Sequence, residues 1–411
     1  MNMKAAWLGR GALVLILIAG IFPFLHKGTG GTSEFPVYTL GGERMLAGEE
    51  IYRTSDPKPF TYPPFFAVPF LTSPDVPMEP PRDALPFVGW YVITAIALVI
   101  VFLVVHRHLV RSEAGAGPPF AFLFYFLTLL FAGRFIASVF GNQSHDLLVF
   151  LPIMLALAAM LKERDGKAAA WLGLAAAFKA TPLLFLGLFI LQRRFTALGI
   201  MVGTVFVATL APDLLFPRQD GNLWILAWLE TFVFKLDPGG PADAGPWLAG
   251  NVLNQSLSGT MHRLLGETGP AWLTPLTQLA VLALVSVAIL KRTDARFVHF
   301  AQFGAVVCGM VLLSPMSSKA HFCVLLLPVA VCVHDALIHR GRVSIAALAT
   351  VFVIGTLTSK DLIGRELGNQ LLAMGTVTWL TVTLLCAMTW HALKTHQSVP
   401  GTDKEGDTAL A

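Results

Sequence analysis

A series of long apolar runs is the feature that most constrains this chain. A hydrocarbon core of about 30 Å is crossed by about 20 helical residues. Runs near that length lie at about residues 7–26, 87–105, 119–140, 146–161, 196–216, 271–290, 297–314, 321–338, 343–358 and 369–393. Only 13% of the residues are charged, against roughly 25% in soluble domains. The sequence therefore predicts an all-α polytopic membrane protein.

Basic connectors between the runs predict the orientation. Lysines and arginines gather on the cytoplasmic side of a membrane protein. The clusters are Lys4 with Arg10, Arg107 with Arg111, residues 162–167, Arg193 with Arg194, residues 291–296, and Arg340 with Arg342. The first run has no A-x-A-like cleavage site after it, so we expect a retained span rather than a signal peptide. This arrangement predicts a multi-pass protein of the cell (inner) membrane with both termini in the cytoplasm.

The stretch 168–194 has basic clusters on both sides, so one straight crossing is excluded. Pro182 lacks an N–H and disfavours helix just before itself. We therefore predict two half-length helices that meet near Lys179. Counting them separately gives about twelve membrane helices in one domain of residues 1–395. The polar tail, residues 396–411, is expected to be disordered.

Composition excludes several classes of function. The four cysteines all lie in apolar runs without C-x-x-C spacing, which argues against a metal cluster or a disulfide framework. The net charge of +4 comes from connector cations, as the membrane orientation requires, so nucleic acid is not an expected partner.

The polar chemistry is predicted to gather on the extracytoplasmic side, in residues 27–86, 140–146, 217–270, 314–321 and 359–369. The first of these loops is far longer than an ordinary connector, which is typical of a functional loop. Its Glu34 lies closest to the first span, and a carboxylate there can serve as a general base. Tyr38 and Tyr62 are candidate substrate ligands. Glu43, Glu49 and Glu50 fit the solvated face of an amphipathic interfacial helix. The aromatic second half of the loop fits an interfacial anchor or a direct role in substrate binding.

Two cations lie inside apolar runs, where charge is expensive and normally faces the bundle interior. Arg134 lies about two turns inside its helix, and it fits either a substrate site, snorkelling to the headgroups or a pair with Asp146. Lys179 marks the predicted helix break and has no acid near it in sequence. His321 fits either a site residue or a helix-end histidine.

Two "NQS" triplets face the same predicted side. Their amides, at Asn142, Gln143, Asn254 and Gln255, can bind sugar hydroxyls through paired donors and acceptors. The triplets also fit N-glycosylation acceptors and helix caps. His145 and Asp146 fit either the edge of an active site or the first turn of the next helix.

Five motifs resemble glycosyltransferase family 87 and occur in that family's order across about residues 33–325. They are "SEFPVY" with "AGEEIY" and "FTYPPFFAVPF", "FGNQSHDLLVFL", "AAWLGLAAAFKATPLLFL", "GNVLNQSLSGTMHRLLG" and "LLSPMSSKAHF". The resemblance implies a membrane-embedded GT-C bundle. It implies an inverting transfer of a sugar, typically mannose, from a polyprenyl-phosphate donor to a lipid or glycan acceptor on the extracytoplasmic face.

The resemblance also implies roles for individual residues. The family's first outer loop carries an Asp in S-D-F-x-x-Y as the base, and Glu34 stands at that position. The family's S-P-I-S-W-S-H-H reads "SPMSSKAH" here, so that Lys319 and Ala320 precede His321. Polyprenyl phosphate is a good leaving group that needs cations around its oxygens, so an obligatory metal or other cofactor is not expected. The candidate phosphate ligands are Arg134, Lys179, Lys319 and His321.

Two other classes of function remain as alternatives. A transporter or lipid flippase would use the Lys179 break as a midplane site, but it would need coupling acids, and the apolar runs contain few, among them Asp146 near an interface. A non-catalytic scaffold would not need membrane cations beneath a long acidic loop. The transferase is therefore the favoured hypothesis.

Overall fold

The structure is a computed structural model that describes residues 34–71, 85–111, 117–234, 250–266, 268–270, 272–358 and 360–394. These residues are helical and contain no strand, which confirms the predicted fold class. Six described helices are long and apolar enough to cross a membrane: Val88–Val110, Pro118–Asn142, Phe195–Leu215, Arg296–Leu313, Lys319–Ile338 and Thr376–Leu393. The expected first span at 7–26 and the tail at 396–411 lie outside the described residues, so the total of twelve stays a prediction.

The described elements are all helical, with short 3-10 and π segments (η) among the α-helices. In chain order they are α2 (Phe35–Leu46), η1 (Pro64–Phe70), α3 (Leu85–Val105), η2 (His106–Val110), α4 (Pro118–Asn142), α5 (Asp146–Met160), α6 (Asp165–Phe178), η3 (Thr181–Phe185), α7 (Leu186–Leu191), α8 (Phe195–Leu215), α9 (Trp224–Leu229), η4 (Glu230–Phe234), α10 (Leu257–Leu265), α11 (Leu273–Ile289), α12 (Arg296–Leu313), η5 (Lys319–Leu325), α13 (Leu326–Ile338), α14 (Arg342–Thr350), η6 (Val351–Thr356), α15 (Lys360–Ile363), α16 (Arg365–Ala373) and α17 (Thr376–Leu393).

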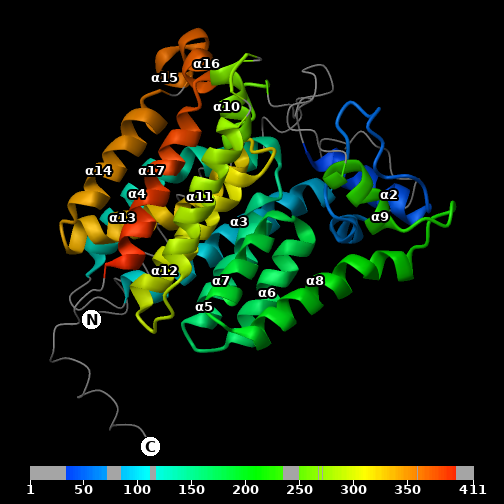
Figure 1. Ribbon diagram of the computed structural model, residues 1–411, viewed down its shortest axis with the longest axis horizontal. Helices are drawn as coiled ribbons and strands as arrows, with labels where there is room; N and C mark the ends of the chain where they lie inside the picture. Colours follow the sequence, from blue (N-terminus) through cyan, green and yellow to red (C-terminus); the bar gives the residue numbers. More distant parts are fainter. Residues whose placement is uncertain are drawn as a thin grey trace, which may run out of the picture.

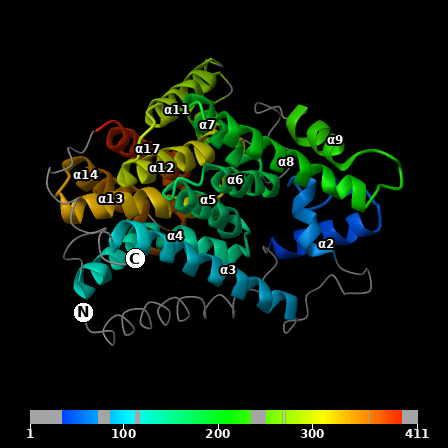
Figure 2. The same cartoon turned by 90° about the horizontal axis from the view of Figure 1, so that it is seen from below.

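Burial separates the centre of the bundle from its periphery. Helix α12 is buried over most of its length and packs against α11, α13 and α17, whereas α8 is largely exposed. Apolar side chains of α8 such as Phe206 and Leu214 are exposed, as expected for a helix that faces lipid, since an apolar surface there is already in an apolar solvent. Figure 2 shows α8 along one side of the bundle, with α5 and α6 between it and α3 and α4.

The predicted break within residues 168–194 is confirmed. Helix α6 ends at Phe178, Lys179 has extended backbone with φ −154° and ψ 127°, and the chain resumes as η3 and α7. Pro182 lies in the first turn of η3, where its missing N–H leaves no helical acceptor unsatisfied. The Lys179 backbone therefore lies outside regular helix. The direction of its side chain is set by contacts with other parts of the chain, such as Asp146.

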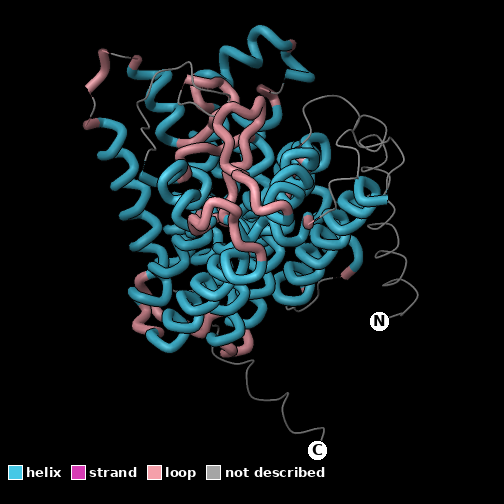
Figure 3. The backbone as a smooth tube through the Cα atoms, turned by 90° about the vertical axis from the view of Figure 1, so that its right-hand side faces the viewer, coloured by secondary structure: helices cyan, strands magenta, loops and turns pink. Residues whose placement is uncertain are grey.

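The first loop folds into a small cap at one end of the bundle. Helix α2 packs on η1, and η1 packs on α8 and α9; Figures 1 and 2 show α2, α9 and the end of α8 at the same end of the molecule. Seen from that side, irregular segments run in front of the helices (Figure 3). The close approach of α2 to η1 needs Gly42, because a Cβ at this position would lie 2.0 Å from the Phe70 carbonyl oxygen.

Two sequence-based expectations are wrong. Helix α2 ends at Leu46, so Glu49 and Glu50 lie outside it: Glu49 pairs with Arg53, and Glu50 pairs with Arg218 at 2.6 Å. The apolar run 369–393 is not one helix, because Gly375, with φ +78°, separates α16 from α17. In both places a glycine with positive φ, Gly48 or Gly375, follows or interrupts the helix that the pattern predicts.

Candidate active site

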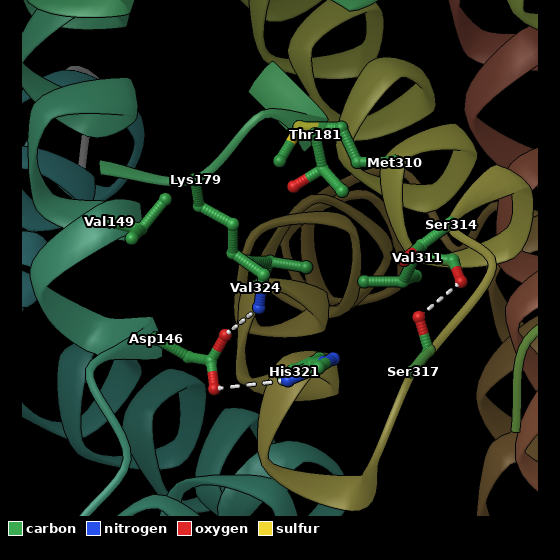
Figure 4. A pocket seen from close by; sticks show the side chains of 10 residues that line it. All are labelled: Asp146, Val149, Lys179, Thr181, Met310, Val311, Ser314, Ser317, His321 and Val324. Atoms are coloured by element: carbon green, nitrogen blue, oxygen red, sulfur yellow. Dashed lines mark hydrogen bonds and ion pairs between the residues drawn. The ribbon is translucent and has the colours of Figure 1, made fainter. Parts of the chain in front are cut away.

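A cavity of about 280 Å³ opens between the first loop, the α6–η3 break, the α9–η4 segment and the turn before η5. Its polar lining includes Thr61, Tyr62, Lys179, Thr181, Ser314 and His321, and its apolar lining includes Pro63, Trp228, Phe232, Val233, Pro315 and Met316. A smaller hollow shares Lys179, Thr181, Ser314 and His321 with this cavity and adds Asp146 and Ser317 (Figure 4). We refer to the larger hollow as the site cavity.

Lys179 lies at the centre of this site. Its ammonium Nζ is 2.7 Å from Oδ1 of Asp146, and only 15% of the lysine side chain and 4% of the aspartate side chain are exposed. Asp146 is the first residue of α5, where a negative charge interacts favourably with the helix dipole. An ammonium has three N–H donors, so Lys179 can hold Asp146 and still offer donors to the cavity that it lines.

His321 lies in η5 and approaches the same carboxylate. Its Nε2 is 3.8 Å from Oδ2 of Asp146, and its Nδ1 accepts a hydrogen bond from the backbone N–H of Ser318 at 3.3 Å. In the neutral ring this bond assigns the proton to Nε2. Figure 4 shows Lys179 and His321 directed toward Asp146 from different elements. The predicted site residues Lys179 and His321 therefore lie in one place.

Glu34 does not line the site cavity itself but contacts a residue that does, Tyr62. Its Oε2 accepts a hydrogen bond from the Tyr62 hydroxyl at 3.2 Å, and its Oε1 is 3.1 Å from Nζ of Lys58. Its backbone N–H donates to the Asn142 carbonyl at 2.9 Å. Tyr62 lines the site cavity, whereas Glu34 itself is not among the residues that line it. The carboxylate is thus connected to the cavity through the Tyr62 hydroxyl.

An aromatic cage holds Tyr62 in that position. The ring of His145 lies 4.5 Å from the Tyr62 ring and 4.6 Å from that of Phe66, and its Nδ1 is 3.0 Å from the Tyr38 hydroxyl. Burial lowers the pKa of His145 to about 3 and raises the pKa of the Tyr62 hydroxyl, so the imidazole is neutral and the hydroxyl keeps its proton. Tyr38 is fully buried and contacts His145 rather than the cavity.

The motif "FGNQSHD" works as a structural unit between α4 and α5. Gln143 has φ 54°, which ends α4; its carbonyl accepts from Trp90 Nε1 at 3.0 Å, and its amide donates to the Tyr91 hydroxyl at 3.2 Å. Ser144 donates its hydroxyl to Asp146. The side-chain amides of Asn142 and Gln143 are not part of the cavity lining, so their predicted sugar contacts stay predictions.

The second triplet supports the turn that carries His321. Asn254 Oδ1 accepts from the Ser317 N–H at 3.1 Å, and its amide donates to the Pro315 carbonyl at 3.0 Å. The Gln255 N–H donates to the Ser317 carbonyl at 2.7 Å. Ser256 caps α10 by accepting from the Gly259 N–H, so one of the capping interpretations is confirmed. Asn254 and Gln255 are both about 1% exposed, and they bind the turn rather than line the cavity.

The remaining predicted cations lie elsewhere. The guanidinium carbon of Arg134 lies 5.3 Å from the centroid of the Phe135 ring, with Nε and Nη1 buried. Lys319 begins η5. Neither residue lines the site cavity. Their proposed contacts with a substrate phosphate are therefore not supported by this geometry.

The structure adds contacts that the sequence does not single out. The sequence pattern favours Asp146 only as a helix start, a site edge or a partner of Arg134, yet it lies against two residues that line the cavity, Lys179 and His321. Lys58 pairs with Glu34, and Trp228 donates its indole N–H to the Thr61 carbonyl at 3.0 Å while lining the cavity. Sequence signals for these contacts are weak because each partner is remote along the chain. The Glu34 carboxylate and the Tyr62 hydroxyl lie near a cavity that Lys179 and His321 line. Such a set of groups can support abstraction of a proton beside a bound anion.

Comparison with known proteins identifies the class of enzyme. The chain is 28% identical over 332 residues to a polyprenol-phosphate-mannose-dependent alpha-(1-2)-phosphatidylinositol pentamannoside mannosyltransferase from Mycobacterium tuberculosis (strain CDC 1551 / Oshkosh); the match covers 76% of this chain and 69% of that protein. The sequence model of glycosyltransferase family 87 matches residues 60–315, more than half of the chain and most of the cavity lining. This membrane protein therefore belongs to glycosyltransferase family 87.

Proposed function

We propose that the protein transfers a sugar from a polyprenyl-phosphate donor to a lipid or glycan acceptor with inversion at the anomeric carbon. The donor is proposed to be polyprenyl-phosphate mannose, because the mycobacterial relative is named for its dependence on that donor. The site is proposed to open on the extracytoplasmic face. Oligomeric state plays no part in this proposal.

The lipid phosphate is proposed to bind at Lys179 and His321. Both side chains line the site cavity, and N–H donors fixed around phosphate oxygens stabilise the charge that develops as the phosphate leaves. The apolar lining around Trp228 and Phe232 accommodates the first part of the isoprenoid chain. A resident metal ion is not required in this scheme, because the phosphate is already a good leaving group.

Glu34 is proposed to be the general base. It takes the proton of the acceptor hydroxyl while that oxygen forms a bond to the anomeric carbon. The bond between the anomeric carbon and the phosphate oxygen breaks, and its electron pair leaves with polyprenyl phosphate. Direct displacement needs one essential carboxylate, unlike the paired carboxylates of a retaining glycosidase. Tyr62 holds the carboxylate toward the cavity at 3.2 Å.

The observation that carries this proposal is that Tyr62 connects the proposed base to the cavity lined by the proposed phosphate ligands. Its ring lines the same cavity as Lys179 and His321, and its hydroxyl binds the Glu34 carboxylate. A base and a phosphate site joined by one side chain fit a single displacement step. Family membership as a glycosyltransferase favours this proposal over the transporter or flippase alternative.

The test uses the purified full-length chain in detergent or nanodiscs, with labelled polyprenyl-phosphate mannose and a phosphatidylinositol mannoside acceptor. We expect Glu34→Gln to lower kcat by about 100-fold or more, in the range typical for loss of a general base. Glu43→Gln is the matched control, because Glu43 lies on the adjoining helix α2 and does not line the cavity. Equal rates for wild type and Glu34→Gln would reject Glu34 as the base, and absence of transfer by wild type from this donor would reject the donor.

A further inference from the structure

The carboxylate of Asp146 lies against both nitrogen groups of the proposed phosphate site, the Lys179 ammonium and the His321 ring. It is 3% exposed and faces three groups: the Lys179 ammonium at 2.7 Å, Nε2 of His321 at 3.8 Å and the Ser144 hydroxyl. Lys179 and His321 also line the site cavity. The two side chains that would meet a lipid phosphate are therefore already in contact with an anion that belongs to the protein.

A phosphate that binds in the site cavity must share the N–H donors of Lys179 and His321 with the Asp146 carboxylate. The Lys179–Asp146 pair carries no net charge, so an incoming phosphate meets an ammonium that is already compensated. Breaking a buried pair by removing one partner leaves an uncompensated buried charge, which is strongly unfavourable. An external anion that restores the compensation then binds more tightly, because its binding removes that unfavourable charge.

This competition affects how readily the product of the proposed reaction is released. The donor is a phosphodiester with one negative charge, whereas the leaving polyprenyl phosphate is a monoester that can carry two. A Lys179 ammonium without a resident partner would hold the product more firmly than the donor, since Coulomb attraction grows with the ligand's charge. Turnover needs the product to leave.

We infer that Asp146 is a resident counter-anion that competes with the lipid phosphate for Lys179 and His321, and so limits how tightly the product is held. This inference rests on the proposed function of the site cavity. It assigns Asp146 a positioning and charge-balancing role without contact to the reacting atoms.

The first test replaces Asp146 with asparagine, which keeps the shape and removes the charge. Binding of polyprenyl phosphate to the full-length protein in nanodiscs is measured directly, together with the thermal midpoint with and without that lipid. We expect the variant without lipid to unfold at a lower temperature than wild type. We expect it to bind polyprenyl phosphate at least about tenfold more tightly and to gain more thermal stability from the lipid. In turnover, kcat and the donor KM should both fall, because product release becomes slow.

A second variant tests the same idea with the opposite sign and keeps the charge. The Ser144 hydroxyl donates to Oδ2 of Asp146, the oxygen that faces Nε2 of His321, so Ser144→Ala leaves that oxygen freer to hold the His321 ring N–H. We expect this variant to bind polyprenyl phosphate about two- to fivefold more weakly than wild type, as loss of one hydrogen bond to a charged group allows. This measurement decides the inference even if Asp146→Asn does not fold.

The matched control is Asp165→Asn. Asp165 begins α6, the helix that ends just before Lys179, and it pairs with Arg194 at 2.5 Å outside the cavity. This control should lose stability without a change in affinity for polyprenyl phosphate. Weaker or unchanged lipid binding by Asp146→Asn, or unchanged or tighter binding by Ser144→Ala, overturns the inference. Failure of wild type to bind polyprenyl phosphate at all would instead count against the proposed function.

Discussion

Lys179 and Asp146 are 33 residues apart in sequence and form an ion pair with 2.7 Å between Nζ and Oδ1. The pair joins the break after α6 to the first residue of α5, and both groups are almost completely buried. Its position explains how a lysine can be kept inside an apolar bundle: the ammonium has a partner on one side and a polar cavity on the other.

The Tyr62 hydroxyl is predicted to matter for catalysis and not for folding. Tyr62→Phe removes the donor to Glu34 and keeps the ring contacts with His145 and Phe66. A single hydrogen bond to a charged group contributes about 1.5 to 3 kcal/mol, so we expect kcat to fall by at least about tenfold, with a smaller change in the donor KM. Steady-state transfer assays measure both constants.

The control for this prediction is Tyr125→Phe. The Tyr125 hydroxyl lies 2.5 Å from Nδ1 of His106, in a part of the bundle that does not line the site cavity. It should leave both constants unchanged. An unchanged kcat in Tyr62→Phe, with normal expression, would mean that Glu34 is oriented by other contacts.

His145 is predicted to make stability depend on pH. Burial lowers its pKa from 6.5 to about 3, so the unfolded chain binds a proton between these values while the folded protein does not. This contribution to stability is fully present above about pH 6.5 and is lost as the pH falls toward 3, with a slope of up to about 1.4 kcal/mol per pH unit. Thermal midpoints at pH 7.5, 6 and 5 should therefore fall more steeply in wild type than in His145→Gln. Parallel curves for the two proteins would show that His145 does not produce the acid sensitivity.

Gly42 is predicted to be required for the cap formed by α2 and η1. A Cβ there would lie 2.0 Å from the Phe70 carbonyl oxygen, and backbone atoms cannot move aside as a flexible side chain does. Gly42→Ala should destabilise the protein by about 1 to 3 kcal/mol, the usual range for overpacking, and should lower transfer by displacing Glu34 and Tyr62. Gly203→Ala is the comparison, because a methyl group added to Gly203 in α8 would meet no heavy atom within 4 Å. If both variants melt alike, the close approach does not limit stability.

The proposed orientation predicts which surface positions are reachable from each side. Asn222 precedes α9 beside the site, Arg292 lies before α12, and both are exposed. In a background with the exposed Cys386 changed to serine, a membrane-impermeant maleimide applied to intact cells should label Asn222→Cys and spare Arg292→Cys. Labelling of Arg292→Cys alone would invert the arrangement and place the site on the cytoplasmic face.

Local pattern was sufficient for most of the helices. The apolar runs at 119–140 and 297–314 correspond closely to α4 and α12, because a run of apolar residues in lipid must satisfy its backbone hydrogen bonds within itself. The break at Lys179 was also predictable, since Pro182 and the two flanking basic clusters are local signals. The pattern failed at Gly375 and after Leu46, where glycines with positive φ, Gly375 and Gly48, interrupt or follow a helix.

The sequence by itself determined that this chain is a helical membrane protein, that its polar residues collect in a few segments and that one helix is interrupted at a lysine. Covalent geometry and the apolar solvent dictate those features over short distances. Only the tertiary structure decided that Lys179 meets Asp146, that Tyr62 connects Glu34 to the cavity and that Asn254 supports the turn before His321. Such contacts join residues 28 to 63 positions apart, and the packing of the whole bundle selects them.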